Sequence, residues 1–325
     1  MRMTTPPASD RHMPRPLIVA AVGYQWFYNG ANFLAFKVAA NALHPLMVAT
    51  LRYVFAALIL LPIALLRLRK TPVSMRQAGG AALVGMIMLV FSQALTIWGT
   101  HFLPAGVAAI FSSSSPIFLA LFAWGLFRRP LTGRQVAGVG IGFVGLASMG
   151  WASAAGGDFR PVGAALVLFA SASWAAGSLL APRLPLPRDP AISLTVQLVT
   201  AAIVIGTVVS LSGIAGATHL ARVPTEAWIA LSFVVLASTV VGYAVFLMLN
   251  AQVSSALANT FYYAAPVVAL GLSALVLGEP LTLAKMASAA IALLGVALMI
   301  GRRAPGPQRA SHLVEAGGTI SAQRA

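Results

Sequence analysis

The sequence predicts an all-α integral membrane protein with ten transmembrane helices, arranged as two inverted five-helix repeats. Three observations predict this fold: an apolar composition, ten long apolar segments and an internal repeat. Of the 325 residues, 59% are hydrophobic and only 8% are charged, whereas a soluble globular domain carries about 25% charged residues. So few charged residues cannot cover the surface of a soluble protein of this length. We therefore expect most of the surface to face the lipid bilayer.

Ten segments are long and apolar enough to cross a membrane, since a span needs about 20 predominantly apolar residues. The apolar runs are continuous rather than alternating, which favours helices over barrel strands. The approximate limits are 16–37, 44–66, 78–99, 104–126, 134–152, 161–181, 191–212, 227–249, 254–276 and 282–301. The polar ends, 1–15 and 302–325, are expected to be disordered tails. We expect the first span to be retained, the alternative being a signal peptide cleaved after Ala40-Asn41-Ala42.

The distribution of basic residues predicts the orientation in the membrane. If the N-terminus is cytoplasmic, 16 of the 21 Lys and Arg residues fall on the cytoplasmic side and three fall outside. An excess of Lys and Arg is typical of cytoplasmic loops, so we expect both termini in the cytoplasm and the protein in the bacterial inner membrane. The net charge of +15 has the same explanation, and no nucleic-acid partner is expected.

The chain aligns with itself. At an offset of 150 residues, the Pro-Leu-Thr phrase at 130–132 recurs at 280–282, and Pro116 aligns with Pro266. Spans 1–2 align with spans 6–7 at an offset of 145. The two repeats are 16–152 and 161–301. Because each repeat has an odd number of spans, the second enters the membrane from the opposite side. Inverted repeats are a recurring architecture of secondary transporters, with the substrate site near the membrane midplane between them.

These matched residues also carry a family resemblance. Over roughly residues 16–301 the chain resembles a bacterial member of the EamA family of the drug/metabolite transporter superfamily. The family's Trp-Gly pair and following Lys correspond to Asn29-Gly30 and Lys37, and its "gEpLt"-like ends to "FRRPLT" and "LGEPLT". The resemblance implies export of amino acids or other small metabolites. The sequence departs from the pattern where Asn29 replaces Trp and where Arg129 replaces the Glu that Glu279 retains.

Pro116 and Pro266 are the expected helix hinges. Each lies near the middle of its span, removes one backbone hydrogen bond and frees a carbonyl at membrane depth. Interrupted spans at corresponding places in both halves are the best sequence pointer to a transporter site. The polar runs before these prolines either line a cavity or satisfy the freed carbonyls. The candidates in them are Ser113, Asn259 and Tyr262.

Further candidates for lining the substrate cavity lie in the first three spans and their counterparts. Gln25, Asn29 and Asn32 fall on one helical face, which should point into the protein, toward a solute or toward neighbouring helices. Arg52 lies about 12 Å along span 2, where it either attracts a substrate carboxylate, snorkels outward or pairs with freed carbonyls. The remaining candidates are Gln93, Trp98, Trp174 and Tyr243.

The sequence carries no constellation typical of an enzyme. All six acids lie in tails, loops or at span ends, so proton or sodium coupling through a buried acid is not expected. Facilitated diffusion, or coupling through Glu279 or a His, is left open. The GxGxxG match at 140–145 lies inside an apolar span and is not a phosphate loop. Gly138, Gly142 and Gly145 are expected to support close helix packing instead.

The sequence therefore predicts a transporter without a cofactor or metal, whose partners are a small-molecule substrate and the bilayer, with a homodimer left open. The alternatives within transport are uptake, or another solute such as a nucleoside, sugar derivative or drug. The alternatives from another class are a membrane sensor and an intramembrane enzyme.

Overall fold

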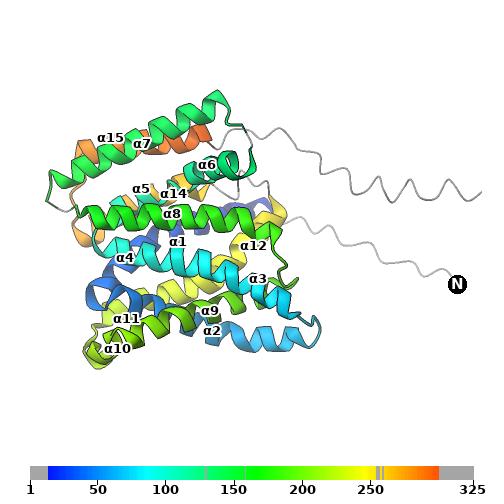
Figure 1. The fold of residues 1–325 in the computed structure, drawn as a ribbon. Helices are drawn as coiled ribbons and strands as arrows, with labels where there is room; N and C mark the ends of the chain where they lie inside the picture. The colour runs from blue at the N-terminus through cyan, green and yellow to red at the C-terminus, as the bar shows by residue number, and fades with distance from the viewer. Residues whose placement is uncertain (1–13, 129, 158, 254–256, 258–259, 300–325) are drawn as a thin grey trace, which may run out of the picture.

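The computed structural model describes residues 14–128, 130–157, 159–253, 257 and 260–299. Figure 1 shows these residues as a bundle of helices. The helices of the first half are α1 (Arg15–Ala42), α2 (Pro45–Leu68), α3 (Met75–Gly85), η1 (Met86–Ala94), α4 (Leu95–His101), α5 (Ala105–Ser112), α6 (Ser115–Phe127) and α7 (Gly133–Ala154). Those of the second half are α8 (Pro161–Leu180), η2 (Ala181–Arg183), α9 (Pro190–Leu211), α10 (Ile214–Ala217), η3 (Leu220–Arg222), α11 (Thr225–Phe233), η4 (Val234–Gly242), α12 (Tyr243–Gln252), α14 (Phe261–Leu277) and α15 (Leu283–Met299).

The expected all-helical membrane fold is confirmed, with about nine or ten apolar helices; α1 is not among those that length and hydropathy alone mark as membrane spans. Within the described part of the chain, seven helices are long and apolar enough to cross a membrane, and α14 and α15 are shorter apolar helices. Four of these seven spans join more than one segment: α5 with α6, α8 with η2, and two that contain a π-helical segment. The segments α3, η1 and α4 form one helix over Met75–His101, and α11, η4 and α12 continue one another in the second half.

Two helices differ from the expected segments. α1 continues to Ala42, because the polar residues near its end are accommodated within the bundle; Lys37 Nζ donates to the His101 carbonyl at 2.9 Å. The fourth span is broken rather than continuous. α5 ends at Ser112 and α6 begins at Ser115, and Pro116 lies in the first turn of α6, so its missing N–H leaves the Ser112 carbonyl at the break open to other donors.

The two halves are packed against each other along most of their helices. α2 packs on α9, α5 on α14 and α7 on α15, while α1 packs on α11 and η4, and α8 on η1 and α4. Figure 1 shows α7 beside α15 at one edge and α2 beside α9 at the other. The start of α1 and the end of α15 lie toward the same side of the bundle (Figure 1).

The α7–α15 contact confirms the expected glycine packing. A Cβ atom added to Gly138 would lie 2.8 Å from the Gly295 carbonyl oxygen, and one added to Gly145 would overlap the backbone of Ala292. A Cβ atom on Gly295 would likewise overlap the backbone of Gly142. No side chain fits between these helices, so glycine at these positions permits backbone-to-backbone contact.

An ion pair joins the ends of α2 and α9. Arg67 Nη1 lies 3.0 Å from Asp189 Oδ2, and Asp189 Oδ1 accepts hydrogen bonds from the backbone N–H groups of Ala191 and Ile192 at the start of α9. Burial alone raises the pKa of Asp189, but the Arg67 guanidinium and these N–H groups together lower it below its ordinary value. The pair thus fixes the helix that carries Arg52 to its counterpart in the second half.

Candidate functional site

Arg52 on α2 is buried within the bundle, with 6% of its surface exposed. Its Nε donates to Thr239 Oγ1 at 3.0 Å, and its Nη1 donates to Gln93 Oε1 at 3.1 Å. The guanidinium carbon lies 5.4 Å from the ring centre of Phe36 and 5.8 Å from that of Tyr53, within cation–π range. Arg52 therefore does not snorkel to the surface; its hydrogen-bond partners are side chains from both halves of the molecule.

Both partners of Arg52 stand in π-helical segments, Gln93 in η1 and Thr239 in η4. A π-helical segment is rare and frequently occurs at a functional site. Its wider turn leaves carbonyl groups open to side chains. Thr239 Oγ1 donates to the Val234 carbonyl at 2.9 Å, and Tyr53 Oη donates to the Leu89 carbonyl at 2.7 Å. Two irregular helices, one from each half, thus converge on one buried cation.

The polar stripe of α1 faces this convergence, as its spacing predicts. Gln25 is 1% exposed and Asn32 is 9% exposed, whereas Asn29 is half-buried and bonds back to the Gln25 carbonyl at 2.8 Å. Asn32 Nδ2 donates to Ser238 Oγ at 2.7 Å, next to Thr239. Within the described residues, Gln25 Nε2 and Asn32 Oδ1 are buried and have no hydrogen-bond partner. One donor and one acceptor are therefore open to a polar group.

Two tyrosines of α1 add contacts to η4. Tyr24 Oη donates to the Ala237 carbonyl at 2.7 Å, and Tyr28 Oη donates to the Gly242 carbonyl at 3.4 Å. Tyr243 follows Gly242 directly and is partly buried. It packs on the main hydrophobic cluster, which is formed largely by buried residues of α1, α2 and α9. α1 is thus joined to η4 along its length, which holds the polar stripe beside Arg52.

The two candidate tryptophans lie in different places. Trp174 on α8 donates from Nε1 to Tyr262 Oη on α14 at 3.1 Å, so two predicted site residues are brought together within the second half. Tyr262 also stacks on Phe261, with ring centres 4.3 Å apart. Trp98 packs instead on the main hydrophobic cluster and lies beside His44 near the end of α1, with ring centres 6.0 Å apart.

The serines before Pro116 are occupied by the backbone. Ser113 Oγ donates to the Ala109 carbonyl at 3.0 Å and Ser114 Oγ to the Phe111 carbonyl at 2.7 Å. The Ser112 carbonyl, freed by the proline, accepts from the hydroxyls of Ser115 and Ser171. Of the two interpretations of this run, the geometry favours satisfaction of freed carbonyls over cavity lining. Asn259, the candidate before the second proline, lies outside the described residues. Pro266 is buried within α14.

Glu279 has a partner that the sequence does not reveal. Its Oε1 accepts a hydrogen bond from the backbone N–H of Ala105 at 2.9 Å, the first residue of α5. A carboxylate at a helix N-terminus satisfies a backbone donor and is favoured by the helix dipole. Glu279 therefore links the α14–α15 connection of the second half to the start of α5 in the first.

The sequence analysis missed Ser238 and Thr239. Their sequence did carry a signal, because they are two adjacent hydroxyl residues inside the apolar run "VVLASTVVG". This signal does not identify a site by itself, because hydroxyl residues in membrane helices commonly bond their own backbone. Of the acids that the structure describes, Asp189, Glu226 and Glu279 all stand at helix ends or connections, and none pairs with Arg52. Among the described residues, the charge of Arg52 is therefore stabilised by polar side chains and aromatic rings and not by a carboxylate.

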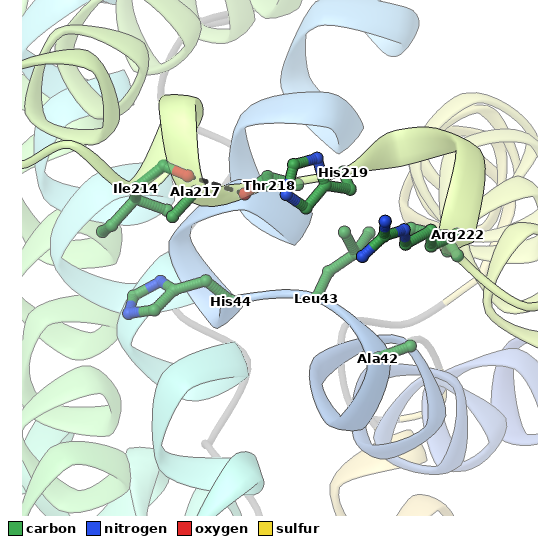
Figure 2. Close-up of a pocket in the computed structure, with 9 residues that line it drawn as sticks. Ala42, Leu43, His44, Ile214, Ala217, Thr218, His219 and Arg222 are labelled. Atoms are coloured by element: carbon green, nitrogen blue, oxygen red, sulfur yellow. Dashed lines mark hydrogen bonds between the residues drawn. The ribbon is translucent and has the colours of Figure 1, made fainter.

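Cavities lie on either side of this centre. One of about 360 Å³ lies beside the α1–α2 connection and the segment between α9 and α11 (Figure 2). Another, of about 200 Å³, lies between α2 and α9 on the side where Arg67 pairs with Asp189, and most of its lining residues are apolar. α2 is therefore flanked by a cavity near each end, with Arg52 between them.

Comparisons with known proteins agree with this architecture. The sequence model of the EamA-like transporter family matches residues 18–151 and 161–301. The chain is 29% identical to the uncharacterized inner membrane transporter YedA of Escherichia coli K12 over 258 residues, covering 78% of this chain and 80% of YedA. It is 26% identical over 276 residues to a protein of Salmonella typhimurium LT2 named a probable amino-acid metabolite efflux pump, covering 82% and 89% of the two chains.

A crystal structure of another protein has a similar fold. It superposes with a TM-score of 0.59 at 17% sequence identity and covers 88% of this chain and 96% of that one. At this identity the likeness concerns the fold alone.

Proposed function

The chain belongs to the EamA-like transporter family, and from this premise we propose that it exports a small polar or amphipathic metabolite, such as an amino acid or an analogue, by alternating access. It is a transporter rather than an enzyme, and its relatives include inner membrane transporters. The names of distant relatives as probable amino-acid metabolite efflux pumps support the solute class and the direction. Uptake and other solute classes are the alternatives.

The proposed topology is ten spans in two inverted repeats, 16–152 and 161–301, with both termini cytoplasmic. The packing pattern supports it. Exchanging each helix with its counterpart in the other half carries the contact of α1 with η4 onto that of α8 with η1, and the contact of α1 with α14 onto that of α8 with α6. The contacts α2–α9 and α7–α15 map onto themselves. Contacts related in this way are expected of a pseudo-two-fold axis in the membrane plane.

Arg52 is the observation that carries the proposal. A buried guanidinium with no carboxylate partner among the described residues is costly, and an ionisable residue within a membrane span is a functional-site candidate by default. It lies where η1 and η4 meet, so relative motion of the halves changes its surroundings. We propose that Arg52 binds the anionic group of the solute, which is a carboxylate in the case of an amino acid.

The open polar atoms of α1 complete the proposed site. Asn32 Oδ1 can accept a hydrogen bond from a solute ammonium or hydroxyl group, and Gln25 Nε2 can donate one. Gln93 and Tyr243 are proposed to tune solute preference at the two π-segments. Asn29, Trp174 and Tyr262 are proposed to border the path.

The remaining assignments concern motion and assembly. Pro116 and Pro266 are proposed as hinges of the two halves. Three further residues are candidates for lining the cavity on the sequence pattern alone: Ser113, Trp98 and Asn259. All these residues come from one chain, so a homodimer would add no side chain to the site.

The proposal is tested by overproducing the protein in bacteria loaded with amino acids and measuring the metabolites released into the medium. Release of at least one small metabolite should rise above the vector level, and Arg52→Gln should lower that release by about 30-fold or more, because loss of a buried charged contact costs about 2–5 kcal/mol. Arg134→Gln is the matched control, since Arg134 is exposed at the start of α7. Unchanged release with Arg52→Gln at equal expression would contradict the proposal.

A further inference from the structure

The cavity in Figure 2 is separate from the Arg52 site and has a chemistry of its own. Its volume of about 360 Å³ falls in the range of small-molecule sites. The lining residues are Ala42, Leu43, His44, Ile214, Ala217, Thr218, His219, Arg222 and Val223. They come from two connections on the same side of the bundle, one from each half.

Every titratable residue that lines the cavity is basic. These residues are His44, His219 and Arg222. Figure 2 shows His219 and Arg222 coming from the segment before α11 and His44 from the α1–α2 connection. Within the described residues, the side chains of His219 and Arg222 make no hydrogen bond or ion pair. Glu226, the nearest acid in the sequence, is exposed on α11 and does not line the cavity.

His44 is held in a defined orientation. The backbone N–H of Leu46 donates to His44 Nδ1 at 3.2 Å, so the neutral imidazole carries its proton on Nε2 and presents a donor there. His44 also precedes α2 directly, and Arg52 follows eight residues later, about 12 Å along the helix. The cavity and the buried arginine are thus two basic sites about 12 Å apart along α2.

We propose that this cavity is an outer binding site for a small organic anion, an oxyanion group attached to an apolar body. Arg222, His219 and His44 supply donors for a carboxylate or phosphate. Leu43, Ile214 and Val223 supply the apolar wall for the rest of the molecule. The oxyanion can belong to a solute or to the head group of an anionic lipid. Only the assignment to the outer side rests on the proposed function; binding itself does not.

The test uses the full-length protein in phosphatidylcholine nanodiscs and titration calorimetry with hexanoate and acetate, with empty nanodiscs as the blank. Hexanoate should bind saturably and more tightly than acetate. Arg222→Gln should weaken hexanoate binding by about tenfold or more, as expected for loss of a charge-assisted hydrogen bond. His219→Gln provides a second variant should Arg222→Gln fold poorly. Arg160→Gln is the control: Arg160 is also basic and exposed in a connection, but packs near Phe102 outside the cavity.

Nanodiscs of phosphatidylglycerol distinguish the two sources of the oxyanion. Loss of hexanoate binding in them, with binding kept in phosphatidylcholine, identifies the lipid head group as the natural occupant; binding in both identifies a solute. No saturable hexanoate binding in phosphatidylcholine, or equal binding by wild type and both variants, would overturn the proposal. Hexanoate binding that Arg52→Gln abolishes and Arg222→Gln leaves unchanged would overturn the proposal and assign the ligand to the transport site, so failure here is distinguishable from failure of the proposed function.

Discussion

At the break between α5 and α6 the freed polar groups are satisfied locally, whereas the two π-segments draw in side chains from distant parts of the chain. Before Pro116, the serine hydroxyls bond carbonyls three or four residues back. Arg52 of α2 donates hydrogen bonds to side chains of both η1 and η4, and Asn32 of α1 donates one to η4. Both regions interrupt a membrane helix. The break receives one hydroxyl from another helix, that of Ser171 on α8, whereas the π-segments bind side chains of α1 and α2 that include a buried cation.

The difference separates a structural break from a candidate binding site. The serines are saturated, so nothing in that run needs a further partner. The π-segments border a buried cation, and α1, which packs on η4, carries two buried amide atoms, Gln25 Nε2 and Asn32 Oδ1, that are unpartnered within the described residues. A buried polar atom without a partner costs about 1–3 kcal/mol, which a bound solute can offset.

The largest effect that distinguishes the two regions is expected from Thr239→Val. The substitution keeps the shape of the side chain but removes the acceptor for Arg52 Nε, so transport by the protein in proteoliposomes should fall by about tenfold or more. Thr200→Val is the matched control, because Thr200 Oγ1 only bonds the Val196 carbonyl on its own helix. Equal transport by wild type and Thr239→Val would remove η4 from the site.

A several-fold effect is expected from Pro116→Ala and Pro266→Ala. Alanine restores the backbone donor and stiffens each helix, so transport should decline while the amount of protein in the membrane stays constant. Initial transport rates normalised to membrane-inserted protein measure this. Normal rates in both variants would show that the halves do not bend at these prolines.

The smallest effect is expected from Ser113→Ala. Its hydroxyl bonds only the Ala109 carbonyl among the described residues, so transport should stay within about twofold of wild type and the free energy of unfolding should drop by about 0.6 kcal/mol. Denaturation in detergent and a solute-competition assay provide both values. A changed solute preference would instead place Ser113 in the transport path and erase the contrast between the two regions.

Residue spacing predicted what depends on helical periodicity. The i, i+4, i+7 positions of Gln25, Asn29 and Asn32 predicted one polar face, and the glycines of α7 predicted a close helix contact. The π-segments could not be predicted, because a shift from i→i+4 to i→i+5 bonding leaves the apolar pattern almost unchanged. Nor could the contact of Glu279 with Ala105, because its partner is a backbone group distant in sequence.

The glycine contact between α7 and α15 has a consequence for biosynthesis. α7 leaves the ribosome long before α15, yet in the folded protein its bare backbone face is covered by α15. The first half therefore waits in the membrane, incompletely assembled, until the second half has been inserted. A chain truncated before Leu283 would keep this face uncovered, which makes it a target for membrane proteases however well its earlier helices insert.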